Sequence, residues 1–331
     1  MDLVELVTAT IAPSGRALCA RSNGTIAFNS KLSGIPDLLL TLQTPSSHKQ
    51  KLGAPPATVL AYPVFHPCVR LSRWRDRPGE LSFVPPDGKF VLASYEVDLL
   101  PTHGAQLQLP VQVEMKTAIG HEGDEFEVRV FVSTASLAPT SGNGSSAAFG
   151  SRGGSTRSPA FGGSSNTPLV IEEISVTIPL PPAVKTLVAT RCSRGEFHHE
   201  GREVVWKIPS GATPSSTVTF RTGVQMRGND DDEEEGEGEG EGGDGKGEGE
   251  EEDEGGGGGG EGGKAAAARR RRLEGAMPRC AIVGFSVKGW LASGVRVESL
   301  KIVGGRGIGE GVKPYKGVKY ITRAGGVEVR C

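Results

Sequence analysis

Strict alternation of apolar and polar residues is the feature that most constrains how this chain can fold. It is clearest in 125-EFEVRVFVS-133 and 170-VIEEISVTIPL-180. A period of two is the spacing of a β-strand that buries one face, whereas an amphipathic helix repeats every 3.6 residues. No segment of the 331-residue chain sustains the helical period. The sequence therefore predicts an all-β protein.

Turn signals separate many short apolar runs. Strands at 17–21 and 25–30 flank Ser22-Asn23-Gly24, and Asn-Gly favours a hairpin between two paired strands. Such short strands with Gly and Pro turns are typical of a β-sandwich. Further strands are expected at 3–11, 37–42, 64–71, 106–115, 185–190, 203–208, 216–224, 281–287, 295–303, 317–323 and 326–330.

The most rigid turn signal is Pro85-Pro86-Asp87-Gly88, between the apolar runs 81-LSFV-84 and 90-FVLASY-95. The two prolines fix φ and remove hydrogen-bond donors, and Asp-Gly permits a tight reversal. We expect this turn to be architectural, setting the register of the two strands, in preference to a direct binding role.

Two low-complexity segments interrupt the strands. Residues 135–167 are rich in Ser, Gly and Ala, and 228–275 is a Gly/Glu/Asp run with a basic end. Neither contains enough apolar surface to offset the entropy of ordering. We expect both segments to be disordered inserts.

The formal charge of −2 conceals a basic remainder. Residues 230–261 hold 17 acidic residues and one lysine. Without these residues the chain has 36 basic and 22 acidic residues. When Lys264 and Arg269–Arg272 are excluded as well, 31 basic and 22 acidic residues remain. The acidic run then either screens its own domain or competes for a basic face that binds anionic membrane or an acidic partner.

The tract 265-AAAARRRRL-273 lies at the end of this acidic run. A run of arginines is compatible with nucleic-acid binding or a nuclear signal. We favour a solvated counter-charge here, and expect no nucleic-acid partner.

Nothing in the sequence indicates catalysis. No phosphate-binding loop, nucleophile motif or zinc-protease motif occurs. His66 and Cys68 do not form a metal-ligand set, and Glu172 and Glu173 are adjacent, so they point to opposite faces of a strand. We therefore expect no enzyme, no cofactor and no metal.

The cysteines and the hydropathy indicate a cytosolic protein. Five widely spaced cysteines without a C-x-x-C motif favour reduced thiols. No apolar run reaches the roughly 18 residues of a transmembrane helix. Any membrane association is expected to be peripheral.

Two blocks carry a family resemblance. The block 64-VFHPCVRLSRWRDRPGELSFVPPDGKFVLASY-95, preceded by 32-LSGIPDLLL-40, resembles the mu-homology domain of clathrin-adaptor medium (mu) subunits, and so does the ending 315-YKGVKYITRAGGVEVRC-331. The resemblance covers residues 1–134, 168–226 and 280–331.

The resemblance implies an elongated two-subdomain β-sandwich. Subdomain A would comprise 1–98 plus 292–331 and would carry the binding site. Subdomain B would be an insertion spanning 99–291. The family also has an N-terminal domain that docks into its complex, and we expect the chain to lack it.

The resemblance further implies a cargo-binding subunit of a heterotetrameric adaptor complex. Such domains recognise cytosolic sorting signals of the form Tyr-x-x-bulky apolar, with large and small adaptor subunits as partners. The expected location is cytoplasmic, peripheral on Golgi and endosomal membranes and on vesicles bound for the vacuole or lysosome. The alternative is a β-sandwich interaction module that binds anionic membrane or an acidic partner without recognising tyrosine signals.

The family's binding residues fall on specific positions here. Asp2 would accept the tyrosine hydroxyl and Lys319 would line its pocket, whereas Asn29 and Gly317 stand where relatives have a basic residue and a tryptophan. A second pocket would take the bulky apolar residue. The alternatives are a terminal charge for Asp2, a solvated lysine for Lys319 and ordinary core for the apolar residues. The apolar pocket falls on Val295, Val297, Leu300 and Val318.

Overall fold

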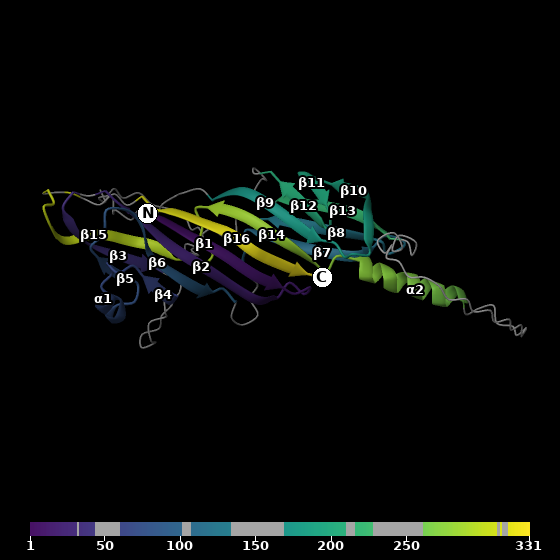
Figure 1. Cartoon of the computed structure of the whole chain (residues 1–331), viewed down its shortest axis with the longest axis horizontal. Helices are drawn as coiled ribbons and strands as arrows, with labels where there is room; N and C mark the ends of the chain where they lie inside the picture. Colours follow the sequence, from purple (N-terminus) through teal and green to yellow (C-terminus); the bar gives the residue numbers. More distant parts are fainter. Residues whose placement is uncertain are drawn as a thin grey trace, which may run out of the picture.

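A computed structural model describes most of the residues of the chain. They are 1–31, 33–43, 60–100, 107–133, 169–209, 216–227, 261–309, 312 and 317–331. In this part of the chain, sixteen strands and two helices form an elongated molecule (Figure 1). The all-β fold class is confirmed.

A nine-stranded sheet runs through the length of the molecule (Figure 1). Its central pair is β1 with β16, which run parallel, and β1 also pairs antiparallel with β2. The order of the nine strands is β11 (Glu196–Glu200), β12 (Glu203–Ile208), β9 (Val170–Pro179), β14 (Cys280–Lys288), β16 (Lys319–Arg330), β1 (Asp2–Ile11), β2 (Ala17–Ser30), β6 (Gly88–Asp98) and β4 (Ala61–Phe65).

Two smaller sheets pack on this long sheet and close a core at each end. The four-stranded sheet is β10 (Val184–Cys192), β13 (Ser216–Met226), β8 (Glu125–Val132) and β7 (Val111–Ile119). The three-stranded sheet is β15 (Arg296–Arg306), β3 (Ile35–Gln43) and β5 (Glu80–Phe83). The predicted alternation is visible in β9, where Ile174, Val176 and Ile178 are buried and the residues between them are only partly buried.

The apolar residues form two separate cores. The large core lies under the four-stranded sheet around Trp206 and Phe220. The small core lies under the three-stranded sheet around Leu38 and Phe83. The predicted boundaries of the subdomains, 1–98 plus 292–331 against 99–291, stay a prediction. The long strands contribute to both cores, because β1 places Leu3 in the small core and Val7 in the large one.

The predicted hairpin at Ser22-Asn23-Gly24 is wrong, because β2 is a single strand from Ala17 to Ser30. Gly24 has a different role. It lies opposite Tyr95 of β6, and a Cβ added to it would stand 2.0 Å from the Cζ of that ring. The absent side chain therefore gives the Tyr95 ring its space.

The turn at Pro85–Gly88 does not set the register between two paired strands, contrary to the prediction. β5 pairs with β3 in the three-stranded sheet, whereas β6 pairs with β2 and β4 in the nine-stranded sheet. The turn therefore carries the chain from one layer to the other. Gly88 has a φ of +86°, a conformation that glycine adopts without strain.

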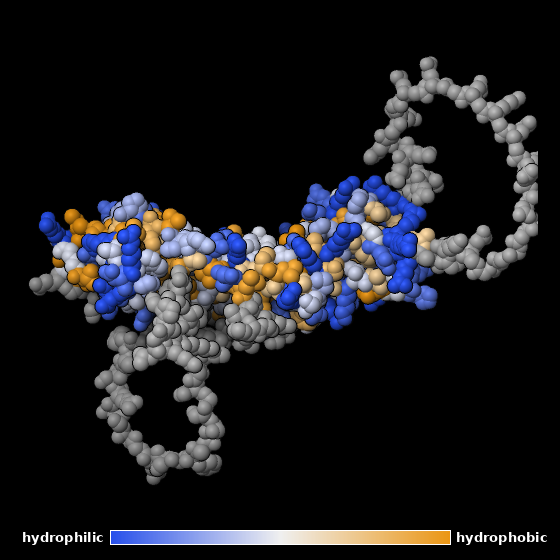
Figure 2. Space-filling model, turned by 90° about the horizontal axis from the view of Figure 1, so that it is seen from below, coloured by the Kyte–Doolittle hydropathy of each residue, from blue (hydrophilic) through white to orange (hydrophobic). Residues whose placement is uncertain are grey.

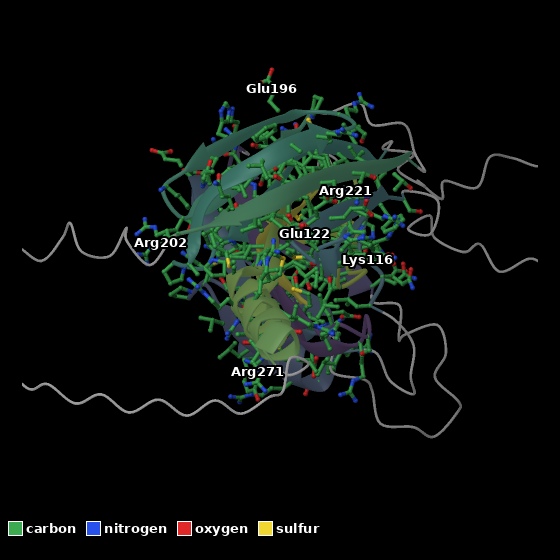
Figure 3. All side chains as sticks on the ribbon, turned by 90° about the vertical axis from the view of Figure 1, so that its right-hand side faces the viewer. Lys116, Glu122, Glu196, Arg202, Arg221 and Arg271 are labelled. Carbon is green, nitrogen blue, oxygen red and sulfur yellow. The ribbon has the colours of Figure 1, made fainter. Side chains whose placement is uncertain are left out.

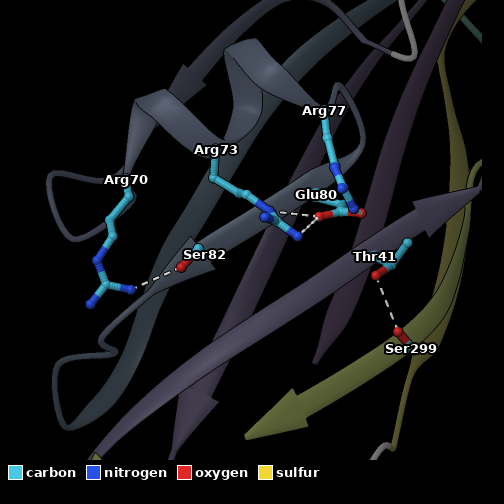
Figure 4. Close-up of polar contacts among 7 residues, drawn as sticks. All are labelled: Thr41, Arg70, Arg73, Arg77, Glu80, Ser82 and Ser299. Atoms are coloured by element: carbon cyan, nitrogen blue, oxygen red, sulfur yellow. Dashed lines mark hydrogen bonds and ion pairs between the residues drawn. The ribbon is translucent and has the colours of Figure 1, made fainter. Parts of the chain in front are cut away.

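The strand predicted at 64–71 is also corrected. β4 ends at Phe65, and Leu71–Asp76 form the short helix α1. The helix buries no residue of its own, and arginine side chains hold it to β5 (Figure 4). The Nε of Arg73 donates to Glu80 at 2.7 Å, and Arg70 donates to Ser82 at 2.8 Å.

The disorder predicted for 228–275 is corrected over its last residues, because α2 spans Glu261–Ala276 (Figure 1). The run Ala265–Ala268 has high helix propensity. Leu273 and Ala276 are buried in the structure, and Ala276 belongs to the large core. The rest of this segment, and the insert predicted at 135–167, lie outside the described residues.

Candidate ligand-binding site

The structure brings Asp2 and Lys319 together at the start of β1 and β16. The two residues are directly opposite in the parallel pair, and the backbone N–H of Lys319 donates to the carbonyl oxygen of Met1 at 3.0 Å. The side chain of Lys319 is exposed, and that of Asp2 is partly buried. Within the described residues, neither side chain forms an ion pair or a hydrogen bond. Both charges therefore remain available to a ligand.

A second lysine, Lys89, for which the sequence gives no signal, lies on the same face. Asp2 is opposite Ala27 of β2, and Asn29 lies two residues further along that strand, so it shares the face of Ala27. Asn29 is opposite Lys89 of β6, and both side chains are exposed. The pairing joins residues far apart in the chain, so no local sequence signal could have revealed Lys89.

The backbone next to Lys319 forms an open strand edge. β14 pairs with β16 only as far as Ile321, opposite Lys288, and Gly289 donates to the carbonyl of Tyr320 at 2.8 Å. The preceding residues, Gly317 and Val318, have no strand on that side among the described residues. The backbone groups of Lys319 face β1, so those of Val318 point to the open side. An extended peptide can pair there.

The predicted apolar pocket divides into buried and accessible residues. Val295 and Val297 are buried in the small core. Leu300 and Val318 are only partly buried and pack against the same core. The hydroxyl oxygen of Tyr320 accepts a hydrogen bond from the backbone N–H of Val297 at 3.1 Å, which joins β15 to β16. The four residues share one cluster, and Leu300 and Val318 form its accessible part.

Beneath the site, three polar side chains lie in a row across the nine-stranded sheet. Tyr95, Gly24, Glu5 and Thr322 are successive cross-strand partners on β6, β2, β1 and β16. We call Tyr95, Glu5 and Thr322 the buried polar row, because Tyr95 is 4% exposed and the other two are 0% exposed. Leu3 and Val7, on either side of Glu5, belong to different cores, so the row marks the junction of the two cores.

The buried polar row is satisfied by internal hydrogen bonds. The hydroxyl of Tyr95 donates to Oε1 of Glu5 at 2.8 Å, and the Oγ1 of Thr322 donates to the carbonyl of Trp290 at 2.8 Å. Ser293 donates to Glu5 twice, through its hydroxyl and through its backbone N–H at 3.0 Å. Burial, followed by the nearby Glu5 carboxyl, raises the pKa of Tyr95 far above its usual value. Tyr95 therefore acts as a hydrogen-bond donor.

Away from this site, α2 docks at the far end of the molecule. A cavity of ≈ 520 Å³ lies between the helix and the loop that joins β7 to β8. Glu122 of that loop pairs with Arg269, and Figure 3 shows Arg271 at the outer side of the helix. On the face seen in Figure 2, hydrophilic residues gather at this end and apolar residues lie along the middle. The described charges here are largely paired, unlike those of Asp2 and Lys319.

The histidine, cysteine and acidic residues of the described part of the chain do not form a metal site. No three His, Cys, Asp or Glu side chains of the described residues are arranged to hold a metal. The Nδ1 of His66 accepts the backbone N–H of Cys68 at 3.2 Å, which is a local structural contact. No described helix combines the length and the hydropathy that a membrane crossing requires.

Comparison with protein families gives one match over the full length. The model of the adaptor complexes medium subunit family matches residues 1–331. The chain is 25% identical over 343 residues to the AP-3 complex subunit mu of Eremothecium gossypii, which covers 100% of the chain and 57% of the relative. It is 25% identical over 331 residues to the human AP-3 complex subunit mu-1, covering 99% of the chain and 56% of the relative. The chain thus spans about half the length of these relatives.

Comparison with solved structures gives the same fold. The yeast delta-COP-I mu-homology domain has a TM-score of 0.54 at 10% identity, covering 99% of this chain and 96% of that one. The Fcho1 mu homology domain of Danio rerio, solved with a bound Eps15 peptide, has a TM-score of 0.51 at 11% identity, covering 100% and 95%. Within the family, the segments 66-HPCVR-70 and 315-YKGVKYITRAG-325, together with Trp74, resemble the mu subunit of adaptor protein complex 3, and both relatives named above are AP-3 mu subunits.

Proposed function

Since this chain belongs to the adaptor complexes medium subunit family, we propose that it is the cargo-binding part of a heterotetrameric adaptor complex. Its ligands are tyrosine-based sorting signals, Tyr-x-x-bulky apolar, in the cytosolic tails of membrane proteins. Its partners are the large and small subunits of the complex. It works on the cytoplasmic side of Golgi and endosomal membranes, in traffic toward the vacuole or lysosome.

The observation that carries this proposal is the pair of free charges beside an open strand edge. Asp2 and Lys319 lie opposite each other without partners among the described residues, and the backbone of Val318 faces the open side. Peptides that add to a sheet edge gain affinity from backbone hydrogen bonds and specificity from alternate side chains.

The spacing of the motif fits the two faces of β16. Lys319 is exposed on the outer face beside Asp2, whereas its neighbour Val318 packs against the small core. In an extended peptide, side chains three residues apart point to opposite faces, because strands have a period of two. The tyrosine therefore lies toward Asp2, and the fourth residue lies toward Leu300 and Val318.

Titration of the purified chain with a Tyr-x-x-Leu peptide and with its Ala-x-x-Leu control tests the proposal. We expect roughly micromolar binding of the first, about −8 kcal/mol. The control should bind at least about tenfold more weakly, because it cannot donate a hydrogen bond to Asp2. Equal binding of the two peptides would show that this domain does not recognise the tyrosine.

A second candidate is a basic surface for anionic membrane. It is favoured by the excess of basic residues outside 230–261, which number 36 against 22 acidic residues. Asn29 and Gly317 also favour it over tyrosine recognition, because they stand where the family has a basic residue and a tryptophan at the tyrosine site. On this view, deletion of 230–261 strengthens binding to phosphatidylserine vesicles, and salt weakens it, since exposed charges are screened over about 10 Å at 0.1 M. Vesicle co-sedimentation decides between the two candidates when it is run beside the peptide titration.

A further inference from the structure

We propose that Glu5 is a positioning residue for the apolar pocket. Through Ser293 it fixes the segment 289–295, which connects β14 to β15, against β1. The inference rests on the proposed function, because it concerns the pocket for the fourth peptide residue. Glu5 itself is 0% exposed and does not touch the ligand.

The contacts form a chain of hydrogen bonds from β1 to the start of β15. The backbone N–H of Val295 donates to the Oγ of Ser293 at 3.1 Å, and this hydroxyl donates to Oε1 of Glu5. The backbone N–H of Ser293 donates to Oε2 of Glu5 at 3.0 Å. One carboxyl group thus holds two donors of the connecting segment. Both oxygens point at the same residue, which leaves this residue little freedom to shift.

The place of the connecting segment decides the shape of the pocket. Val295 lies two residues after Ser293 and Val297 two residues further on, so both valines take their positions from this attachment. Val318 belongs to the other wall, at the start of β16. The carboxyl group on β1 therefore fixes one wall of the pocket relative to the strand pair that holds the other wall.

The tyrosine side of the site does not depend on this attachment in the same way. Asp2 and Lys319 are placed by the backbone pairing of β1 with β16, through bonds that Glu5 does not make. Loss of the Glu5 contacts should therefore affect recognition of the fourth peptide residue and leave recognition of the tyrosine intact. A general loss of stability would instead weaken recognition of the tyrosine and of the fourth peptide residue together.

Three variants of the full chain separate positioning from stability. Glu5→Gln replaces one acceptor oxygen by an NH2 group, which cannot accept a hydrogen bond from Ser293. Ser293→Ala removes the hydroxyl from a partly exposed loop residue, so folding is not at risk. Tyr95→Phe is the matched control, because it removes another bond to Glu5 and leaves both donors of Ser293 in place.

Each variant is titrated with four peptides, Tyr-x-x-Leu, Tyr-x-x-Ala, Ala-x-x-Leu and Ala-x-x-Ala. In Glu5→Gln and Ser293→Ala, the preference for Leu over Ala at the fourth position should fall about tenfold, the loss expected for hydrogen bonds to a carboxylate. The preference for Tyr over Ala at the first position should stay at the wild-type value. In Tyr95→Phe, both preferences should match the wild type even though the midpoint of urea unfolding falls.

The outcomes distinguish the inference from the proposed function. An unchanged Leu preference in Ser293→Ala overturns the inference, and so does an equal loss of Leu preference in Tyr95→Phe. A parallel loss of the Tyr preference in Ser293→Ala overturns it as well, since this result indicates general damage. A wild-type chain that binds all four peptides equally overturns the proposed function and the inference with it. If Glu5→Gln does not fold, Ser293→Ala decides alone.

Discussion

Asp2 is the residue at which recognition of the tyrosine can be tested most directly. Its carboxyl has no partner among the described residues, so the ligand hydroxyl meets no competing donor. A hydrogen bond to a charged group contributes roughly 1.5–3 kcal/mol. We therefore expect Asp2→Ala to weaken binding of the Tyr-x-x-Leu peptide about ten- to hundredfold, as measured by calorimetric titration.

Replacing the peptide tyrosine by phenylalanine supplies the second arm of a thermodynamic cycle. Each change alone should cost a similar amount, and the two together should cost little more than one, because both delete the same bond. Full additivity of the two losses would mean that Asp2 is not the partner of the hydroxyl. Lys89→Ala is a useful additional variant, since this cation lies opposite Asn29 on the same face.

Gly24 gives a prediction about packing. A Cβ at this position would stand 2.0 Å from the Tyr95 ring, so Gly24→Ala must displace the ring and with it the bond to Glu5. Overpacking of this kind costs roughly 1–3 kcal/mol, which urea unfolding can measure. Gly275→Ala is the control, because nothing lies within 4 Å of its added Cβ. Alanine in place of a helical glycine should stabilise α2 by about 0.5–1 kcal/mol, so the two changes should have opposite signs.

Among the elements, α2 shows which contacts hold a peripheral helix. Leu273 is 6% exposed, whereas Arg269 and Glu122 form an ion pair between half-exposed side chains. Removing a buried leucine side chain costs about 2–5 kcal/mol, and an exposed ion pair contributes about 0–1 kcal/mol. We expect Leu273→Ala to lower the free energy of unfolding far more than Glu122→Gln does. Equal effects in urea unfolding would assign the docking to charge.

The elements also show how far sequence patterns suffice. Alternation predicted strands well where it occurs, because burial of one face imposes it directly on the residues, as in β9. The patterns could not tell which strands pair. For this reason the Asn23-Gly24 signal wrongly predicts a hairpin, and the Pro85–Gly88 turn wrongly predicts the pairing of two strands that lie in different sheets.

The same limit explains the outcome at the site. The family resemblance placed Asp2 and Lys319 in one pocket, and the β1–β16 pairing brings them together. Lys89 and Glu5 had no such signal. Their roles arise from contacts across long stretches of sequence, such as the bond from Ser293 to Glu5 over 288 positions. Whether Val295 and Val297 were core or pocket residues depended on burial, which alternation alone does not determine.

At the scale of the molecule, the long strands couple the two cores. β1 contributes Leu3 to the small core and Val7 to the large core. Opening either core therefore disturbs a strand on which the other depends, and we expect a single cooperative unfolding transition. Trp206 is buried in the large core and Trp74 packs against the small core, so each can report on one of them.

The measurement uses two variants that keep one of these tryptophans and replace the remaining ones by phenylalanine. Fluorescence should give the same urea midpoint for both reporters, after correction for the stability of each variant by circular dichroism. Two separate midpoints would instead show that the sandwiches unfold independently, as loosely joined domains do.

The parallel pairing of β1 with β16 also has a consequence for biosynthesis. During synthesis β1 emerges well before β16, and the backbone contact between Met1 and Lys319 closes a loop of more than 300 residues. Such distant contacts form slowly, and the edge of β1 that pairs with β16 stays unpaired until β16 has emerged. A nascent or prematurely terminated chain without β16 therefore lacks the pairing of Asp2 with Lys319, so the proposed peptide site forms only after β16 has been made.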